Sequence, residues 1–399
     1  MKQEIPLFKV FMSEPAVLAA ASVLRSGYIG EGEVVKKFEN DLKHFNRNTN
    51  IQYDVITCNS ATSAEHLIYH MLKTERELTA YYDYAATNIK WNNARKAEVI
   101  STPLTCTATN WPILHNDYKI AWADIDPTTM NISLESIVDL INENTRIITV
   151  VHWGGYPVDM DALNLIVRAA EARWGNKILI VEDCAHALGS TYKGTPVGFT
   201  GNLSTFSTQA IKHLTTVDGG FIASPFREFS KEARLLRWYG IDRDSPRTDF
   251  RCEQNIPNIG FKFHMNDVNA SIGIENLKSM KYVISKHQQN ALYYNTALQN
   301  VPGVTLLENH PDKKSSYWLY TMRVQDRMNF MKKMHDAGIV TSRVHERNDL
   351  HSALQDYETC NLGLPNLDMV TKDMICIPVG WWVTPEQVEY ITDIIKTGW

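Results

Sequence analysis

A lysine, a carboxylate and a hydroxyl-rich turn in this sequence have the residue types and positions of a cofactor site. The apolar run ILIVED ends in Asp183, and a second run, STFSTQ, leads toward Lys212. If both runs are strands of a parallel sheet, the two side chains lie near its carboxyl edge, where α/β proteins form ligand crevices. Taken alone, the pair also fits a structural ion pair.

Two further features favour a ligand. Thr215-Thr216 and Gly219-Gly220 follow Lys212, and small residues let the backbone and a flat ligand approach closely. Residues 54–58 lead through the hydroxyl-rich residues 59–63 into a helix, whose free amides can hold a phosphate. In a pyridoxal 5′-phosphate site the lysine forms a Schiff base, the carboxylate keeps the pyridine nitrogen protonated and a helix terminus anchors the phosphate. The sequence therefore predicts this cofactor.

A parallel sheet covered by helices is needed to position these groups. From Tyr53 to about Ser224, short apolar β-branched runs alternate with stretches of helical spacing. Several runs are apolar throughout, as expected when both faces of a sheet are buried. Strands are predicted at residues 54–58, 98–101, 119–124, 146–152, 177–182, 203–207 and 220–223. Helices are predicted between them at residues 63–72, 134–142 and 161–173.

The chain is predicted to form a large cofactor domain over residues 12–273 and a smaller α+β domain over residues 274–399. A short helix begins the large domain, with Ser13 as its N-cap and Ser26-Gly27 as its stop. The small domain begins with a long polar helix at 275–300 and ends with a segment at 384–397. Residues 73–96 are polar and rich in Tyr and Asn, and we interpret them as an insertion that either packs on its own aromatics or lines a binding surface.

The composition excludes several classes of protein. The 399 residues are 44% apolar and 21% charged with a net charge of −5, which excludes disordered and collagen-like chains and argues against a nucleic-acid partner. No run approaches the roughly 20 apolar residues that cross a bilayer. The six cysteines contain no C-x-x-C pair, and no His and carboxylate spacing suggests a metal. We therefore predict a cytoplasmic protein with reduced thiols, no metal and no membrane association.

The sequence resembles the sugar-nucleotide aminotransferases of the DegT, DnrJ and StrS type, which are dimeric pyridoxal phosphate enzymes of fold type I. The resemblance covers nearly the whole chain, and apart from the insertion its motifs follow the family's order and spacing. It implies an α/β fold with a mostly parallel central sheet flanked by helices, plus a smaller α+β C-terminal domain. The motifs are IPLFKVFM, SGYIGEGEVVKKFE, NSATSAEHL, TPLTCTATN, ADIDPTTMNIS, VHWGGYPVDMDAL, VEDCAHALGSTYKG, FSTQAIKHLTTVDGG, LRWYGIDR and GFKFHMNDVNASIG.

The resemblance implies roles for the residues that match these motifs. Lys212 falls on the Schiff-base lysine and Asp183 on the partner of the pyridine nitrogen, so these two are the predicted catalytic residues. His186 stands where many members carry Gln near the phenolic oxygen of the cofactor, and Ser207 falls on a phosphate-binding serine.

Three further positions differ from the usual family pattern. Ala61, Thr62 and Ser63 replace a usual Gly-Thr-Ser/Ala turn at the phosphate. Cys106 occupies the position of an aromatic residue that commonly stacks on the pyridine ring, so another residue stacks there or none does. Lys262 replaces an Asn that reaches across the dimer to the neighbour's phosphate, where a lysine acts as a point charge.

The resemblance also implies the reaction. L-glutamate gives its amino group to a keto-sugar linked to a nucleotide, and a homodimer with shared active sites makes an amino sugar for glycan or O-antigen biosynthesis. His345 and Arg347 lie in a loop near the sugar and are candidate substrate contacts, although a solvated polar loop is an equal alternative.

Other functions stay open on this scaffold. They are a pyridoxal phosphate sugar dehydratase, an aminotransferase for a keto-cyclitol, and a regulatory protein that binds the cofactor without turnover. The dehydratase branch carries histidine in place of the lysine. The family's lysine lies seven residues before the first glycine of the Gly219-Gly220 pair, which is Lys212 and not His213, so transamination is favoured.

Overall fold

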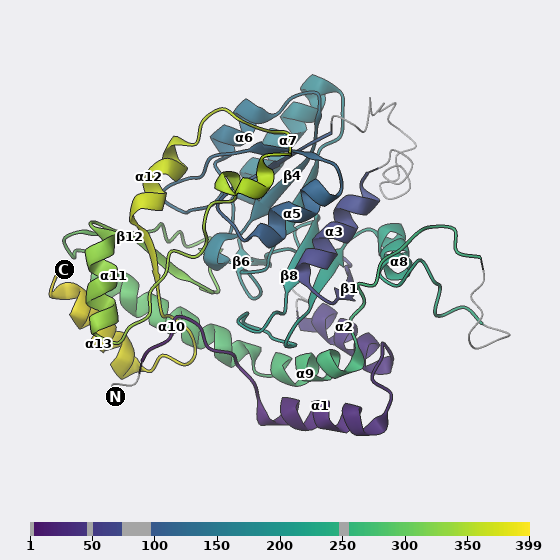
Figure 1. Ribbon diagram of the computed structural model, residues 1–399, viewed down its shortest axis with the longest axis horizontal. Coiled ribbons are helices and arrows are strands. Elements are labelled where there is room, and N and C mark those ends of the chain that lie inside the picture. The colour runs from purple at the N-terminus through teal and green to yellow at the C-terminus, as the bar shows by residue number, and fades with distance from the viewer. Residues whose placement is uncertain (1–3, 46–50, 74–96, 247–254) are drawn as a thin grey trace.

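An eight-stranded sheet forms the centre of the protein in a computed structural model, which describes residues 4–45, 51–73, 97–246 and 255–399 (Figure 1). The strands in spatial order are β1 (Asp54–Cys58), β9 (Gly220–Ser224), β8 (Leu203–Ser207), β5 (Leu179–Asp183), β4 (Thr145–Val151), β2 (Glu98–Ser101), β3 (Lys119–Trp122) and β13 (Thr359–Asn361). Every neighbouring pair is parallel except the two that involve β9. The predicted mostly parallel sheet is therefore confirmed.

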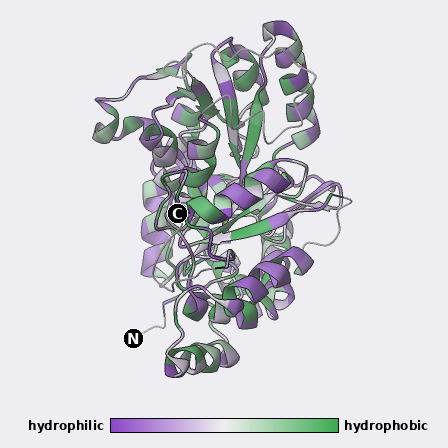
Figure 2. Ribbon diagram, turned by 90° about the vertical axis from the view of Figure 1, so that its right-hand side faces the viewer, coloured by the Kyte–Doolittle hydropathy of each residue, from purple (hydrophilic) through white to green (hydrophobic). Residues whose placement is uncertain are grey.

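The sheet is buried on both faces, which explains its continuous apolar strands. Successive residues of a strand belong to different core clusters: Ile147 lies in one cluster and Ile148 in the other. In Figure 2 the strand ribbons are largely green, whereas the outer helices carry purple segments. The covering helices are α2 (Glu33–Phe45), α3 (Ala61–Met71), α5 (Thr107–His115), α6 (Leu134–Leu140), α7 (Met160–Trp174), α8 (Arg227–Leu236), α9 (Asp267–Leu277) and α12 (Pro365–Asp373), while α1 (Glu14–Ser26) packs against α9.

The C-terminal part contains a separate core cluster on a small antiparallel sheet. Its strands are β10 (Val304–Leu306), β12 (Tyr320–Val324) and β14 (Met374–Ile377), and its helices are α10 (Met280–Leu298), α11 (Arg327–Asp336) and α13 (Pro385–Lys396). The C-terminal end lies beside these helices in Figure 1, and near the start of the described chain Ile5 forms a bridge with Ile339 after α11. A third, three-stranded sheet joins the two parts through β6 (Thr191–Tyr192), β7 (Thr195–Pro196) and β11 (Lys313–Lys314).

The structure corrects one predicted helix and leaves two predictions open. Residues 275–300 form parts of two helices, because the chain turns after α9 with the Ser279 N–H bonded to the Asn276 carbonyl, and α10 begins at Met280. The predicted domain boundary at 273/274 falls inside α9 and stays a prediction. The predicted insertion lies, apart from Lys73, outside the described residues. None of the described helices is long and apolar enough to cross a membrane.

A buried ion-pair network fixes α2 and α8 against the edge strand β1, which leads into the candidate site. Glu39 of α2 is buried and accepts hydrogen bonds from Arg234 and from Arg237, the latter at 2.6 Å. The same carboxylate accepts the backbone N–H and the hydroxyl of Thr57, each at 2.9 Å. Burial alone raises the pKa of Glu39, but the two arginines and Thr57 outweigh it and lower this pKa to about 2.

Glu39→Gln is expected to lower the free energy of unfolding by about 3–5 kcal/mol at pH 7, because it leaves two arginines facing a neutral group. The depressed pKa means that the carboxylate stabilises the folded state above the unfolded-state pKa and loses this effect as the pH falls toward 2. The loss relative to wild type should therefore shrink in acid, as measured by urea unfolding at pH 7 and pH 4. The exposed Glu33→Gln is the control and should cost no more than about 1 kcal/mol.

Candidate active site

Asp183 ends β5 at the carboxyl edge of the sheet and is buried. Its Oδ2 accepts a hydrogen bond of 2.6 Å from the hydroxyl of Thr109 in α5, and its Oδ1 accepts the Ala185 N–H at 2.9 Å. These two donors hold the carboxylate in one orientation. Ser207, also buried, ends the neighbouring strand β8. The predicted carboxylate and the predicted phosphate-binding serine thus lie on adjacent strand ends of one sheet edge.

Lys212 lies in the loop between β8 and β9, and its ammonium group is 3.5 Å from the centroid of the Trp318 ring. Burial lowers the pKa of this lysine to about 8, and the nearby side chains of Asp183 and Cys106 only partly oppose this effect. The loop therefore brings Lys212 near both residues, as the sequence predicts. A lysine with this pKa is in part a neutral amine at neutral pH, which is the nucleophilic form.

The start of α3 forms a small polar cradle next to Ser207. Ser60 caps the helix by accepting the Ser63 N–H at 3.0 Å, so the amides of Ala61 and Thr62 remain at the open helix end. Ser207 pairs with Gly220 across the sheet, and a Cβ on that glycine would come within 2.4 Å of the Ala61 nitrogen. Glycine is required there because β9 and the helix start approach so closely.

Two histidines, His186 and His345, lie near Lys212 and Trp318. His186 stacks on Trp318 with centroids 3.9 Å apart, and His345 lies 6.0 Å from His186 with nearly parallel rings. Burial, reinforced by the charge of Lys212, lowers the pKa of both histidines, that of His345 to about 4. His186 Nδ1 and His345 Nε2 are buried and have no hydrogen-bond partner among the described residues. Unpaired polar atoms in a buried site are a cost that a polar ligand removes.

Two predicted site residues, Arg347 and Lys262, are not part of this cluster. Arg347 is buried and forms a two-bond ion pair with Asp349 and a second ion pair with Asp368, so its charge is already neutralised. The Arg347 guanidinium is thus engaged by carboxylates of the protein, and its burial does not match the alternative of a solvated polar loop. Lys262 is exposed, with its ammonium 4.1 Å from the centroid of Trp238, while its backbone carbonyl accepts from the Asn59 side chain at 3.2 Å.

The sequence analysis missed two residues of this site. Trp318 precedes β12 in the C-terminal part, and nothing in its local sequence pointed to Lys212. Glu65 is buried in α3 within reach of Asp183. A signal for it existed, because Glu65 lies at helical spacing from Ala61 and Ile68, on a stripe of buried residues where a charge is unusual.

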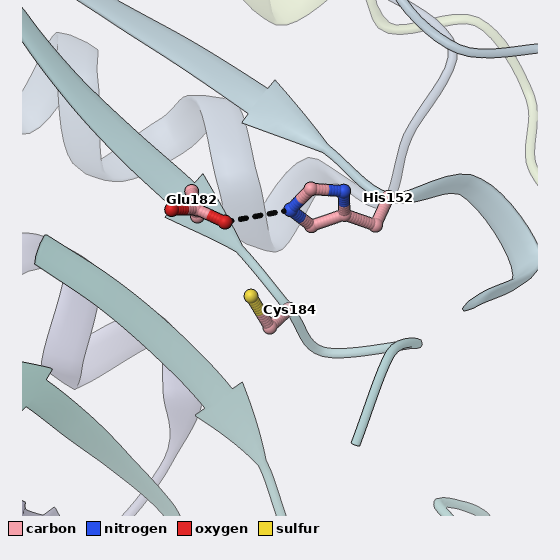
Figure 3. Close-up of side chains that lie close together, drawn as sticks. All are labelled: His152, Glu182 and Cys184. Atoms are coloured by element: carbon pink, nitrogen blue, oxygen red, sulfur yellow. Dashed lines mark hydrogen bonds and ion pairs between the residues drawn. The ribbon is translucent and has the colours of Figure 1, made fainter. Parts of the chain in front are cut away.

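A second cluster of polar side chains lies on the opposite face of β5. Figure 3 shows His152, Glu182 and Cys184, whose ligand atoms all lie within 4.8 Å of one another. His152 Nδ1 accepts the Val158 N–H at 3.1 Å, so its other nitrogen carries the proton and donates to Glu182 at 3.1 Å. Because both ring nitrogens are engaged by protein groups, the cluster is a structural hydrogen-bond network.

His213 is directed away from the lysine. This buried residue bonds the Ser316 carbonyl through Nε2 at 3.1 Å and packs against His287. The residue that interacts with Asp183 in this loop is Lys212.

The arrangement fits pyridoxal phosphate. Lys212, with a pKa of about 8, could bind the carbonyl group of the cofactor. Asp183, held by two donors, could bind the pyridine nitrogen at the other end of the ring. Ser207 and the helix start could hold a phosphate, and the unpaired His186 Nδ1 could bond a phenolic oxygen. Cys106 caps α5 near Lys212 and brings no aromatic ring, whereas Trp318 does.

The matching family model and three similar proteins are all named as aminotransferases. The model of the DegT/DnrJ/EryC1/StrS aminotransferase family matches residues 12–396. The sugar aminotransferase CalS13 of Micromonospora echinospora is 37% identical, with a TM-score of 0.88 over 99% of this chain and 100% of that one. The UDP-4-amino-4-deoxy-L-arabinose–oxoglutarate aminotransferase of Shewanella sediminis is 30% identical over 76% of this chain and 71% of its own. Spr1654 of Streptococcus pneumoniae, solved in PLP and PMP forms, is 25% identical with a TM-score of 0.84 over 98–99% of this chain and 98% of its own.

Proposed function

Because the chain belongs to the DegT/DnrJ/EryC1/StrS aminotransferase family, we propose that it moves the amino group of L-glutamate to a nucleotide-linked keto-sugar. The sugar carries its keto group at carbon 3 or 4, and the product is an amino-sugar nucleotide for glycan biosynthesis. The chain is a pyridoxal phosphate-dependent sugar aminotransferase. The choice of donor is supported by the Shewanella relative, whose name pairs a UDP-linked amino sugar with oxoglutarate.

The observation that carries the proposal is the position of the Lys212 amine beside Trp318, under the influence of Asp183. Bound pyridoxal phosphate supplies a reactive carbonyl and a protonated ring that withdraws electrons from the substrate α-carbon. Asp183, fixed by Thr109 and the Ala185 N–H, holds a proton on the pyridine nitrogen. The Lys212 amine would hold the cofactor through its carbonyl group and, when free, would serve as the general base and acid that moves the proton of the donor α-carbon.

The same geometry favours transfer over dehydration. Dehydration needs a general base other than a lysine amine at this position, but His213 is occupied by the Ser316 carbonyl. Removal of a sugar hydroxyl would also need a proton donor on the sugar side. The pKa of His345 is held at about 4 by burial and by Lys212, so this residue is neutral at pH 7 and better suited to bind a sugar hydroxyl than to protonate it.

The assembly and location are also part of this proposal. A homodimer with shared sites gives the exposed Lys262 of one chain a phosphate to bind in the other, since its side chain is not committed to an ion pair within the described residues. A location in the cytoplasm, where nucleotide sugars are made, is supported by the five free cysteines among the described residues.

The test of the function is a pair of half-reactions followed by absorbance. The yellow holoenzyme should bleach with L-glutamate and recover its colour with 2-oxoglutarate or with the correct keto-sugar nucleotide. Steady-state kinetics should be ping-pong, with parallel double-reciprocal lines. A panel of 3-keto and 4-keto sugars on UDP, GDP and dTDP, read by product mass and NMR, identifies the acceptor. Colour that does not bleach with any amino donor would instead support the regulatory alternative.

A further inference from the structure

Glu65 is a buried carboxyl group next to the carboxylate that is proposed to hold the pyridine nitrogen. It lies in the second turn of α3 with 2% of its surface exposed. Its Oε1 accepts the hydroxyl of Thr205 at 3.1 Å, whereas its Oε2 has no donor to accept from among the described residues. Thr205, which donates to Glu65, is paired with Asp183 across the β5–β8 ladder, so Glu65 lies beside the end of β5 with its carboxyl group within reach of the Asp183 carboxylate. Two ionised carboxylates cannot form a hydrogen bond with each other, so one of them must carry a proton.

The local donors decide which of the two carries it. Asp183 accepts two hydrogen bonds, from Thr109 and from the Ala185 N–H, and such bonds favour the ionised form of a carboxyl group. Glu65 accepts only the Thr205 bond, and the described chain offers it no ion pair. This difference favours the proton on Glu65, where the unpaired Oε2 is free to carry it.

We infer that Glu65 is a positioning residue, a neutral carboxylic acid that donates a hydrogen bond to Asp183 and keeps a single negative charge beneath the pyridine nitrogen. The inference deepens the proposed function, because it rests on the proposed role of Asp183. With Thr109 and the Ala185 N–H, Glu65 supplies a third donor, so three of about four lone-pair directions of Asp183 are engaged. The remaining direction would be left for the ring nitrogen of the proposed cofactor.

The electrostatics of the pocket agree with a neutral Glu65. Burial first, and then the charge of Asp183, raise the pKa of Glu65 well above its ordinary range, while the Thr205 bond opposes this only in part. Cys106 also raises it when ionised. The other titratable neighbours, Tyr69 and Cys184, are neutral at pH 7 because burial raises the pKa of each. None of these groups supplies a positive charge that would favour ionised Glu65.

The first test uses the apoprotein, so it does not depend on turnover. The infrared spectrum of apoprotein labelled with 13C-carboxyl glutamate should contain the carbonyl band of a protonated carboxyl group at pH 7. This band should be absent in Glu65→Gln and should shift in wild type when pyridoxal phosphate is added. An apoprotein without such a band at pH 7, or with a band that pyridoxal phosphate leaves unchanged, overturns the inference. The wild-type measurement stands even if the variant does not fold.

The second test is the pH dependence of thermal unfolding in the same apoproteins. A raised folded-state pKa means that the folded state loses stability as the pH rises above the unfolded-state pKa. Glu65→Gln lacks this loss. The melting temperature of the variant should therefore rise relative to that of wild type by about 1–2 °C for each pH unit between pH 5 and pH 8. A gap that stays constant or reverses would mean that Glu65 is ionised in the folded state.

The third test separates positioning from simple packing. Glu65→Gln keeps a donor for Asp183, so its dissociation constant for pyridoxal phosphate should stay within about twofold of wild type, whereas Glu65→Leu should bind about five- to tenfold more weakly. Equal affinities for the two variants would reduce Glu65 to a packing role and overturn the inference. If the wild-type protein does not bind pyridoxal phosphate, the proposed function is wrong. The infrared and thermal-unfolding tests on the apoprotein would still show whether Glu65 is protonated.

Discussion

Lys212→Ala is expected to bind pyridoxal phosphate without the lysine linkage and to lose about 10²–10⁴-fold or more in the glutamate half-reaction. That factor is typical of removing a general acid–base group, and the loss of the covalent link adds to it. Half-reaction rates are read by stopped-flow absorbance. Because the amine is what the reaction uses, small primary amines such as methylamine should restore part of the rate. A variant with wild-type half-reaction rates would overturn the assignment of Lys212.

The pH dependence of cofactor capture tests the same residue in the wild-type apoprotein. Only the neutral amine attacks the carbonyl, and burial lowers the pKa of Lys212 to about 8. The rate at which pyridoxal phosphate is incorporated should therefore rise with pH and level off above about 8, rather than above the ordinary lysine value near 10.4. The exposed Lys193→Ala, which removes a lysine paired with Asp161 far from the site, is the matched control and should leave this profile unchanged.

Asp183→Ala is expected to reduce the half-reaction rate about 10²–10³-fold, the usual effect of losing one preorganised electrostatic contact to the reacting group. The physical reason is that the pyridine nitrogen loses the charge that keeps it protonated. N-methyl pyridoxal phosphate carries a permanent positive charge on that nitrogen, so it should recover much of the rate in the variant. A variant that reacts at the wild-type rate with ordinary cofactor would contradict the role of Asp183.

The neighbouring carboxylate gives a matched control for that variant. Glu182 precedes Asp183 in β5 and therefore faces the opposite side of the sheet, where it accepts hydrogen bonds from His152 and Asn202. Burial opposes ionisation of Glu182, but these bonds and one from Thr200 lower its pKa, so it is a structural anion. Glu182→Gln should lower the melting temperature and leave the response to N-methyl pyridoxal phosphate as in wild type.

The main sheet and the two ends of the cofactor site could be predicted from the sequence because their signals are local. Residues 147–151 (IITVV) carry apolar side chains at both odd and even positions, as expected for a strand buried on both faces, and β4 occupies Thr145–Val151. Asp183 was identifiable because a carboxylate directly after such a run must reach the sheet edge. Lys212 was identifiable by its place before the Gly219-Gly220 pair, which lets β9 approach α3.

What the sequence could not determine are the contacts between distant segments. Trp318 reaches Lys212 only because the segment before β12 packs against the large sheet, and such a contact between residues far apart in the chain leaves no periodic pattern. Arg347 resembled a free cation in a polar loop, but tertiary folding placed Asp368 of α12 beside it. The ion pair with Asp349 is local, but the ion pair with Asp368 depends on how this loop folds against α12, which no short window of sequence contains.

The sequence by itself thus determined the sheet and the cofactor class, and it predicted Lys212 and Asp183 as the residues that bind the cofactor, from burial, from spacing and from the resemblance to the family. Only the tertiary structure decided the protonation of the site. Glu65 and Asp183 lie far apart in the chain, and it is their burial side by side, with no ion pair to either carboxyl group among the described residues, that gives the pair one proton. Charge states in a protein interior depend on neighbours in space, and the sequence specifies these neighbours only through the fold.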